Sequence, residues 1–225
     1  MPRVLWLSVF VSAVLVVLLP LLFGEIMLGA LGRLHLSPQT AAALMIAIVV
    51  GGFVNIPVRR IAHDHQVVVH PFAVLGLGHR FPRLRRIRRE TVIAVNVGGC
   101  VIPSVLVLYE LSRLDAAADG GLTAAVLAAA VNTAVCYVTA RPVPGVGIAM
   151  PGLLSAVVAA GLGLVLAPAE AAPVAWVAGV AGPLIGADLL HLRDFAHKAA
   201  GTVSIGGAGT FDGIVLSGIV AAYLA

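Results

Sequence analysis

Two aspartates in apolar surroundings are the residues of this sequence best suited to chemistry. Asp188 lies within Pro183–His191, and Asp212 lies 24 residues further on, in the glycine-rich segment Gly206–Gly213. A carboxylate at membrane depth is costly, so such residues usually mark a functional site or an ion pair. Two carboxylates that lie side by side share one proton. The ionised partner then activates a water while the protonated partner polarises a peptide carbonyl, as in aspartic proteases.

Glycines and a proline-rich turn are expected to bind the substrate of such a pair. Glycine lets an extended substrate approach the backbone closely, and prolines lack the amide donors that would occupy nearby carbonyls. The predicted groove is shaped by the Gly206–Gly213 loop and the Arg141–Gly147 turn. Its predicted binding residues are Gly186, Gly207, Gly209, Gly213, Arg141, Pro142 and Asn96. Gly182 and Gly186 are also spaced for close helix contact.

Three other interpretations of the aspartates stay open. In the first they are structural, with Asp212 capping a helix and Asp188 paired with Arg141 or Arg193. In the second they bind a cation or a proton in a transporter or channel, and the segment Asn96–Pro103 breaks a helix to expose carbonyls to the ion. In the third the chain is a non-catalytic membrane assembly protein.

No metal or cofactor is expected, although several histidines are suitably spaced for ligands. His191, Asp194 and His197 recur every three residues, and His63 and His65 fall on the same side of the predicted membrane. The sequence has neither a HExxH nor a CxxC motif, so histidines in contact with solvent are favoured over a metal site.

The composition indicates a membrane protein with an all-α fold. The chain has 225 residues, of which 60% are hydrophobic and 11% are charged, whereas soluble domains have about 25% charged residues. Runs of about 20 apolar residues predict about seven spanning helices in one integral membrane domain, residues 1–225. The expected helices cover 4–23, 37–56, 91–109, 122–140, a stretch ending near 166, 173–192, and a last one ending at 225. The first run is too long for a typical signal peptide, which favours a retained helix.

The basic residues orient the predicted helices. Twelve of the fourteen Lys and Arg residues fall on the N-terminal side of the membrane, most of them in the polar loop 59–90. Basic residues collect on the cytoplasmic side, so the N-terminus and this loop are predicted to be cytoplasmic and the C-terminus to lie outside. Asp188 and Asp212 then share a depth near the cytoplasmic surface. Short β structure is expected around residues 66–76.

Membrane lipids and a transmembrane peptide are the predicted partners. The block Arg83–Arg89 is expected to bind anionic headgroups. Nucleic acid is disfavoured because no aromatic residues interleave with these arginines. The sequence leaves the oligomeric state open.

Four motifs carry a resemblance to known proteins. Asn96–Gly99, Ala140–Ile148, Ile185–Leu190 and Ser204–Gly213 together resemble an uncharacterised family of prokaryotic multi-pass membrane proteins. This implies a protein of the prokaryotic inner (cytoplasmic) membrane. The two aspartates on consecutive helices also loosely resemble presenilin and signal-peptide-peptidase proteases. That resemblance implies an intramembrane aspartyl protease that cleaves membrane-embedded segments near the cytoplasmic side, with Asp188 and Asp212 as its catalytic pair.

Overall fold

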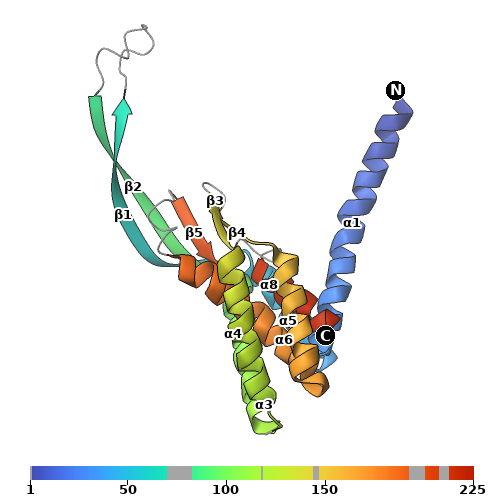
Figure 1. Ribbon diagram of the computed structural model, residues 1–225. Helices are drawn as coiled ribbons and strands as arrows, with labels where there is room; N and C mark the ends of the chain where they lie inside the picture. The colour runs from blue at the N-terminus through green and yellow to red at the C-terminus, as the bar shows by residue number, and fades with distance from the viewer. Residues whose placement is uncertain (1, 70–82, 118, 144–146, 193–200, 208–212) are drawn as a thin grey trace.

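The computed structural model describes residues 2–69, 83–117, 119–143, 147–192, 201–207 and 213–225, and most of them are helical (Figure 1). The α-helices are α1 (Pro2–Gly32), α2 (Pro38–Gly51), α3 (Ile102–Ala117), α4 (Gly121–Thr139), α5 (Gly152–Leu166), α6 (Ala171–Ala181) and α8 (Gly213–Leu224). A short 3-10 helix, η3 (Pro168–Glu170), precedes α6, and π-helical segments form η2 (Val97–Val101) and η4 (Gly182–Leu189). The strands are β1 (Asn55–Val69), β2 (Arg83–Asn96), β3 (Arg141–Val143), β4 (Gly147–Ala149) and β5 (Gly201–Ile205).

Three helical stretches of the described chain are long and apolar enough to cross a membrane. They are Val97–Ala117, Gly121–Thr139 and Pro168–Leu192. Shorter apolar helical segments of 10–17 residues are Pro38–Gly51, Gly152–Leu166, Gly213–Leu224 and the C-terminal part of α1, Leu18–Gly32. This pattern indicates a membrane protein.

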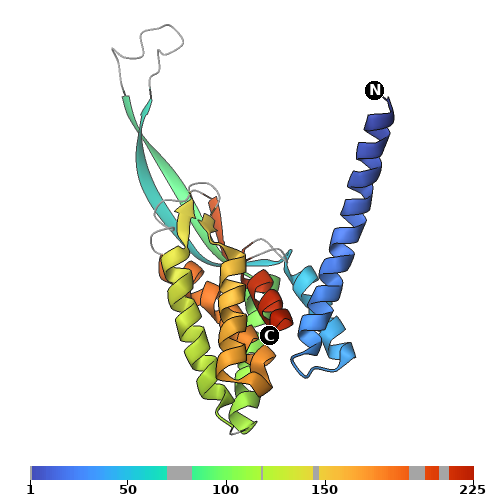
Figure 2. The same ribbon diagram turned by 45° about the vertical axis from the view of Figure 1, so that its right-hand side comes forward.

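The helices run between two chemically different ends of the molecule. All strands lie at one end, which we call the sheet end, and the connections α1–α2, α3–α4 and α5–α6 lie at the other, the loop end (Figures 1 and 2). The N-terminal half of α1 stands apart from the other helices in both views, whereas its C-terminal part packs on α2 and α8 through Met27 and Leu31. The β1–β2 hairpin rises away from the helices at the sheet end.

The described chain is mostly helical, as expected, but it has more β structure than the short stretch expected around residues 66–76. β1 pairs antiparallel with β2 from Asn55↔Asn96 to Val69↔Arg83, and β5 adds parallel to β2. Consequently α2 ends at Gly51 instead of near residue 56, and residues 91–96 are strand instead of helix. The run 91–95 is rich in β-branched residues, which favour a strand when a partner is present. Pro57 lies at the register shift of β1, where a strand tolerates a missing amide hydrogen.

A layer of buried polar side chains joins four helices within the bundle. Asn132 of α4 donates from Nδ2 to Ser155 Oγ of α5 at 3.0 Å and to the Ala178 carbonyl of α6 at 2.9 Å. Ser155 Oγ lies 2.8 Å from Ser217 Oγ of α8. Each of these three side chains is at most 2% exposed. The surrounding contacts are made by small apolar residues, mainly alanines of α4, α5 and α6.

Candidate functional site at the sheet end

Asp188 is held against the turn that follows β5. It is half-buried in η4, and its Oδ2 accepts a hydrogen bond from the backbone N–H of Gly206 at 2.9 Å. Gly206 has φ 79° and Gly207 has φ 60°, a left-handed turn that glycine adopts at little cost. The carboxylate is therefore fixed on the segment that leads towards the second aspartate.

Asp212 and Gly209 lie outside the described residues, so their approach to Asp188 stays a prediction. Gly213, directly after Asp212, begins α8 and is half-buried. A Cβ at Gly213 would lie 3.6 Å from Met150 Cε, just after β4. The start of α8 is thus beside the β3–β4 hairpin.

Asn96 connects β2 to the helical break that follows it. Its Oδ1 accepts the Gly99 N–H at 2.7 Å, so it caps the start of η2. Its Nδ2 donates to the Gly52 carbonyl at 2.8 Å and to Asn55 Oδ1 at 3.2 Å. The side chain is fully buried, and both amide hydrogens have acceptors. These bonds give Asn96 a positioning role, and substrate contact by it stays a prediction.

Ser204 is a member of this junction that the sequence reasoning does not identify as a site residue. Its Oγ donates to Asn55 Oδ1 at 2.6 Å, which ties β5 to β1 across the C-terminal end of β2. The two residues are 149 positions apart in the chain. A single serine in an apolar segment does not predict such a contact, which depends on how the strands pair.

Two π-helical segments meet at the Gly206 turn. Asp188 reaches it from η4, and Gly99 of η2 lies so close that a Cβ there would be 1.9 Å from the Gly206 carbonyl oxygen. A Cβ at Gly206 would in turn lie 2.7 Å from Cys100 Cβ. Glycine at these positions is thus required by the packing of backbone on backbone. Such π-helical turns within α-helices are often found at functional sites.

The contacts of Gly186 are those of helix packing. A Cβ there would lie 2.4 Å from the Thr133 carbonyl of α4, which confirms the expected close helix contact. His191 Nδ1 lies 3.0 Å from the Gly186 carbonyl oxygen, and its ring stacks on Tyr137 of α4 with centroids 4.8 Å apart. Because a carbonyl only accepts, Nδ1 carries the hydrogen. A substrate contact at Gly186 stays a prediction.

The two ends of the proline-rich segment are short paired strands. Arg141 pairs with Ala149 and Pro142 with Ile148 in the β3–β4 hairpin. Arg141 is exposed at the start of β3. The hairpin therefore offers extended backbone at the same end of the molecule as Asp188 (Figure 1).

The described residues contain no group of three or more His, Cys, Asp and Glu side chains placed to hold a metal ion. Arg193, Asp194 and His197 lie outside the described residues, and for His63 and His65 only the backbone is described.

Comparisons with known proteins identify a family without assigning an activity. Searches of curated proteins and of solved structures returned no significant match. The resemblance to presenilin-type proteases thus stays a prediction. Residues 49–224 match the family described as "Protein of unknown function (DUF1614)", and the chain belongs to that family.

Proposed function

We propose that the protein is an intramembrane aspartyl protease in which Asp188 and Asp212 share the acid and base roles. The observation that carries the proposal is the hydrogen bond from the Gly206 N–H to the Asp188 carboxylate. It holds Asp188 on the turn from which the chain reaches Asp212 six residues later. Burying a carboxylate in a helix that spans the membrane costs free energy. A role in function therefore explains the position of Asp188 better than a role in stability.

The proposed chemistry needs only the two side chains and one water. The ionised aspartate takes a proton from the water, whose oxygen attacks the peptide carbonyl carbon. The protonated aspartate gives its proton to the carbonyl oxygen as the tetrahedral intermediate forms. The intermediate then collapses, the C–N bond breaks, and a proton passes to the leaving nitrogen. Hydrolysis adds one water in total and returns the pair to its shared-proton state.

The surroundings of Asp188 suit an extended peptide. The glycine turn has little side-chain bulk, and the β3–β4 hairpin supplies extended backbone next to the start of α8. The substrate class we propose is a membrane-embedded peptide segment, cleaved near the sheet end. Arg141, Pro142, Gly207, Gly209 and Gly213 line this path in the proposal.

We further propose that all seven predicted helices cross the membrane of a prokaryotic cell, with the N-terminus and the sheet end cytoplasmic. The connections α1–α2, α3–α4 and α5–α6 lie at the end of the molecule opposite to the strands, which supports this interpretation (Figures 1 and 2). The excess of arginine at the sheet end agrees with a cytoplasmic location. Membrane lipids are then partners of the exposed apolar helix faces.

A cleavage assay with asparagine variants tests the protease. Purified protein in bilayers is incubated with transmembrane peptides, with and without an aspartyl-protease transition-state analogue. We expect Asp188→Asn and Asp212→Asn each to abolish cleavage. The fold persists at Asp188→Asn, because an amide oxygen still accepts the Gly206 N–H. Asp119→Asn, a change of an exposed carboxylate at the loop end, is the matched control and keeps activity. Cleavage by the double variant Asp188→Asn/Asp212→Asn would reject the proposal.

An ion- or proton-coupled transporter or channel is the second candidate, favoured by one observation. The π-helical segment η2 begins the stretch Val97–Ala117, η4 interrupts the stretch Pro168–Leu192, and both contact the Gly206 turn. Interrupted helices expose backbone carbonyls that bind coupling ions in transporters. This candidate predicts ion flux in proteoliposomes that depends on one aspartate and tolerates loss of the other. The protease requires both aspartates, so the single variants separate the two functions.

A further inference from the structure

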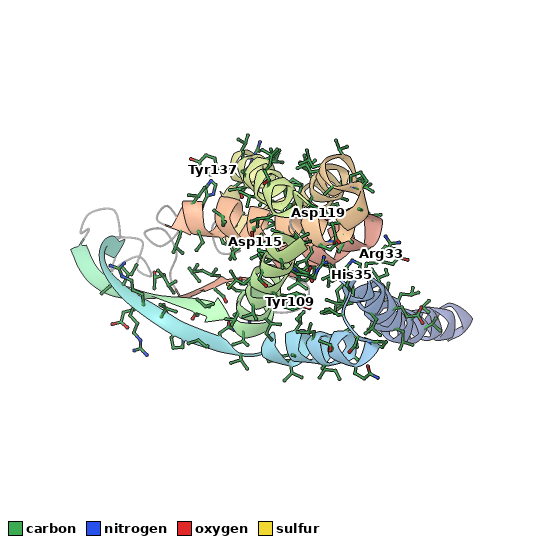
Figure 3. The ribbon with its side chains drawn as sticks, turned by 90° about the horizontal axis from the view of Figure 1, so that it is seen from below. Arg33, His35, Tyr109, Asp115, Asp119 and Tyr137 are labelled. Atoms are coloured by element: carbon green, nitrogen blue, oxygen red, sulfur yellow. The ribbon has the colours of Figure 1, made fainter. Side chains whose placement is uncertain are left out.

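A second group of charged residues lies at the loop end, far along the bundle from Asp188. Arg113 of α3 donates from Nε to Glu110 Oε2 at 3.0 Å. Its Nη1 and Nη2 both contact the carboxylate of Glu170 in η3. His35 Nε2, in the α1–α2 loop, lies 3.6 Å from Glu170 Oε2. Figure 3, drawn from this end, shows His35 and Arg33 near the α1–α2 loop and Asp119 at the α3–α4 turn.

Exposure falls steeply across this group. The side chain of His35 is 58% exposed, that of Glu170 17%, that of Arg113 24% and that of Glu110 0%. Glu110 is thus a fully buried carboxyl group within the spanning stretch Val97–Ala117. A buried carboxylate is stable only when it is fully paired and hydrogen-bonded.

One guanidinium does not neutralise two carboxylates. Glu170 takes two of the three nitrogen contacts of Arg113, in a fork geometry that favours an ionised partner. With both glutamates ionised, the three side chains would carry a net charge of −1. The charged groups that act on Glu110 are Arg113, His35 and Glu170, and His35 adds positive charge only when it is protonated.

An unpaired atom supplies independent evidence. Among the described residues, Glu110 Oε1 is buried and has no hydrogen-bond partner, and the same holds for Trp176 Nε1 of α6. Gly218 of α8 packs closely on Trp176, since a Cβ there would lie 3.2 Å from Cζ3 and 3.3 Å from Cε3. Trp176 shares a core cluster with Leu106, one helical turn before Glu110. An ionised Oε1 in this setting would be a charged acceptor without any donor.

We propose that Glu110 is a proton-binding site within the membrane, with the proton on Oε1 and the Arg113 Nε–H bonded to Oε2. Binding one proton takes the group Glu110, Arg113 and Glu170 from −1 to neutral. Loss of the proton leaves a carboxylate that competes with Glu170 for Arg113 and so couples protonation to the contact between α3 and η3. The site is distinct from Asp188 and does not depend on the proposed protease activity.

Infrared spectroscopy of the whole protein in bilayers tests this proposal without requiring a reagent to reach the site. A protonated carboxyl group has a C=O stretching band well separated from the bands of a carboxylate. A component of this band from the shared proton of Asp188 and Asp212 is identified by its loss in Asp188→Asn/Asp212→Asn. We expect a further component in the wild type at neutral pH that is shifted in heavy water and absent from Glu110→Gln. It should disappear as pH rises. Asp115→Asn, which changes an exposed carboxylate on the same helix, should leave the band intact.

The variant Glu170→Gln tests whether Glu170 and Glu110 compete for Arg113. Removing the competing charge leaves Arg113 entirely to Glu110, so Glu110 should ionise and the band should be lost at neutral pH. A merely buried glutamate with no role in proton binding would not respond in this way. Absence of this further component from the wild type, or its persistence in Glu110→Gln or in Glu170→Gln, would overturn the proposal.

Discussion

Asn96 shows at the residue scale how one side chain holds the sheet end together. It caps η2, donates to the end of α2 and bonds to Asn55 in β1. Because the side chain is fully buried, water does not replace these bonds when they are lost. The Gly206 turn, which binds Asp188, packs directly on η2 through Gly99. By capping η2, Asn96 therefore helps to position this turn.

Replacing Asn96 with alanine should therefore cost stability. We expect a loss of about 2–3 kcal/mol, since the Gly52 carbonyl and the Gly99 N–H are left without partners in a buried site. Unfolding of the purified protein in detergent measures the change. Asn55→Ala is the comparison variant: it removes one bond of Asn96 but leaves the Gly52 carbonyl and the Gly99 N–H paired, so its loss should be smaller. Equal losses in the two variants would contradict the positioning role of Asn96.

At the scale of elements, the polar layer of Asn132, Ser155 and Ser217 connects helices whose contacts are made mostly by small side chains. Its bonds join α4, α5, α6 and α8. Gly182 in η4 makes room for this layer, because a Cβ there would lie 2.5 Å from Asn132 Nδ2. Hydrogen bonds between membrane helices are individually modest, so the layer adds to close packing instead of replacing it.

Ser155→Ala tests this layer. We expect a destabilisation of roughly 1 kcal/mol, since Asn132 and Ser217 both lose a partner. Ser112→Ala is the control: Ser112 is exposed on α3 and bonds only to the Tyr109 carbonyl of its own helix. Its effect should stay within about 0.5 kcal/mol. Resistance to unfolding by a denaturing detergent compares the two variants, and a larger loss in Ser112→Ala would contradict the layer's role.

At the scale of the whole molecule, the two ends have different chemistry. The sheet end has most of the arginines, in the β1–β2 hairpin. The loop end has the Glu110, Arg113 and Glu170 network together with Asp115 and Asp119 (Figure 3). Many large apolar side chains on the helices between them are exposed, as expected for faces in contact with lipid.

Cysteine labelling in cells tests the proposed orientation. In a background with Cys100 and Cys136 replaced by alanine, Gly78→Cys should react with a membrane-impermeant reagent only after the membrane is opened. Asp119→Cys, at the loop end, should react in intact cells. The expected asymmetry follows from the arginine excess in the hairpin. The opposite pattern would show that the orientation is reversed. Labelling of both positions in intact cells would show that the two ends do not lie on opposite sides of the membrane.

The sequence by itself determined the features that depend on local pattern. Composition and apolar run length indicate a membrane protein, and α4 and α5 end within a residue or two of their predicted ends. Ser37 and Pro38 mark the start of α2, where Ser37 Oγ accepts the Thr40 N–H. The helical segment that begins after Asn96 also follows from the local sequence, since asparagine caps its start and glycines allow close approach, although a strand and not a helix precedes it.

Only the tertiary structure decided the contacts between distant segments. Residues 91–96 form a strand because β1 lies on one side and β5, more than a hundred residues later, lies on the other. Helical and extended conformations suit the same apolar residues, so the available partner decides between them. The same holds for the hydrogen bond from Gly206 to Asp188 and for the ion pair between Arg113 and Glu170. Each joins segments that are far apart in the sequence, so the sequence does not predict the contact. Periodicity reports which face of an element is buried, and packing alone determines what that face meets.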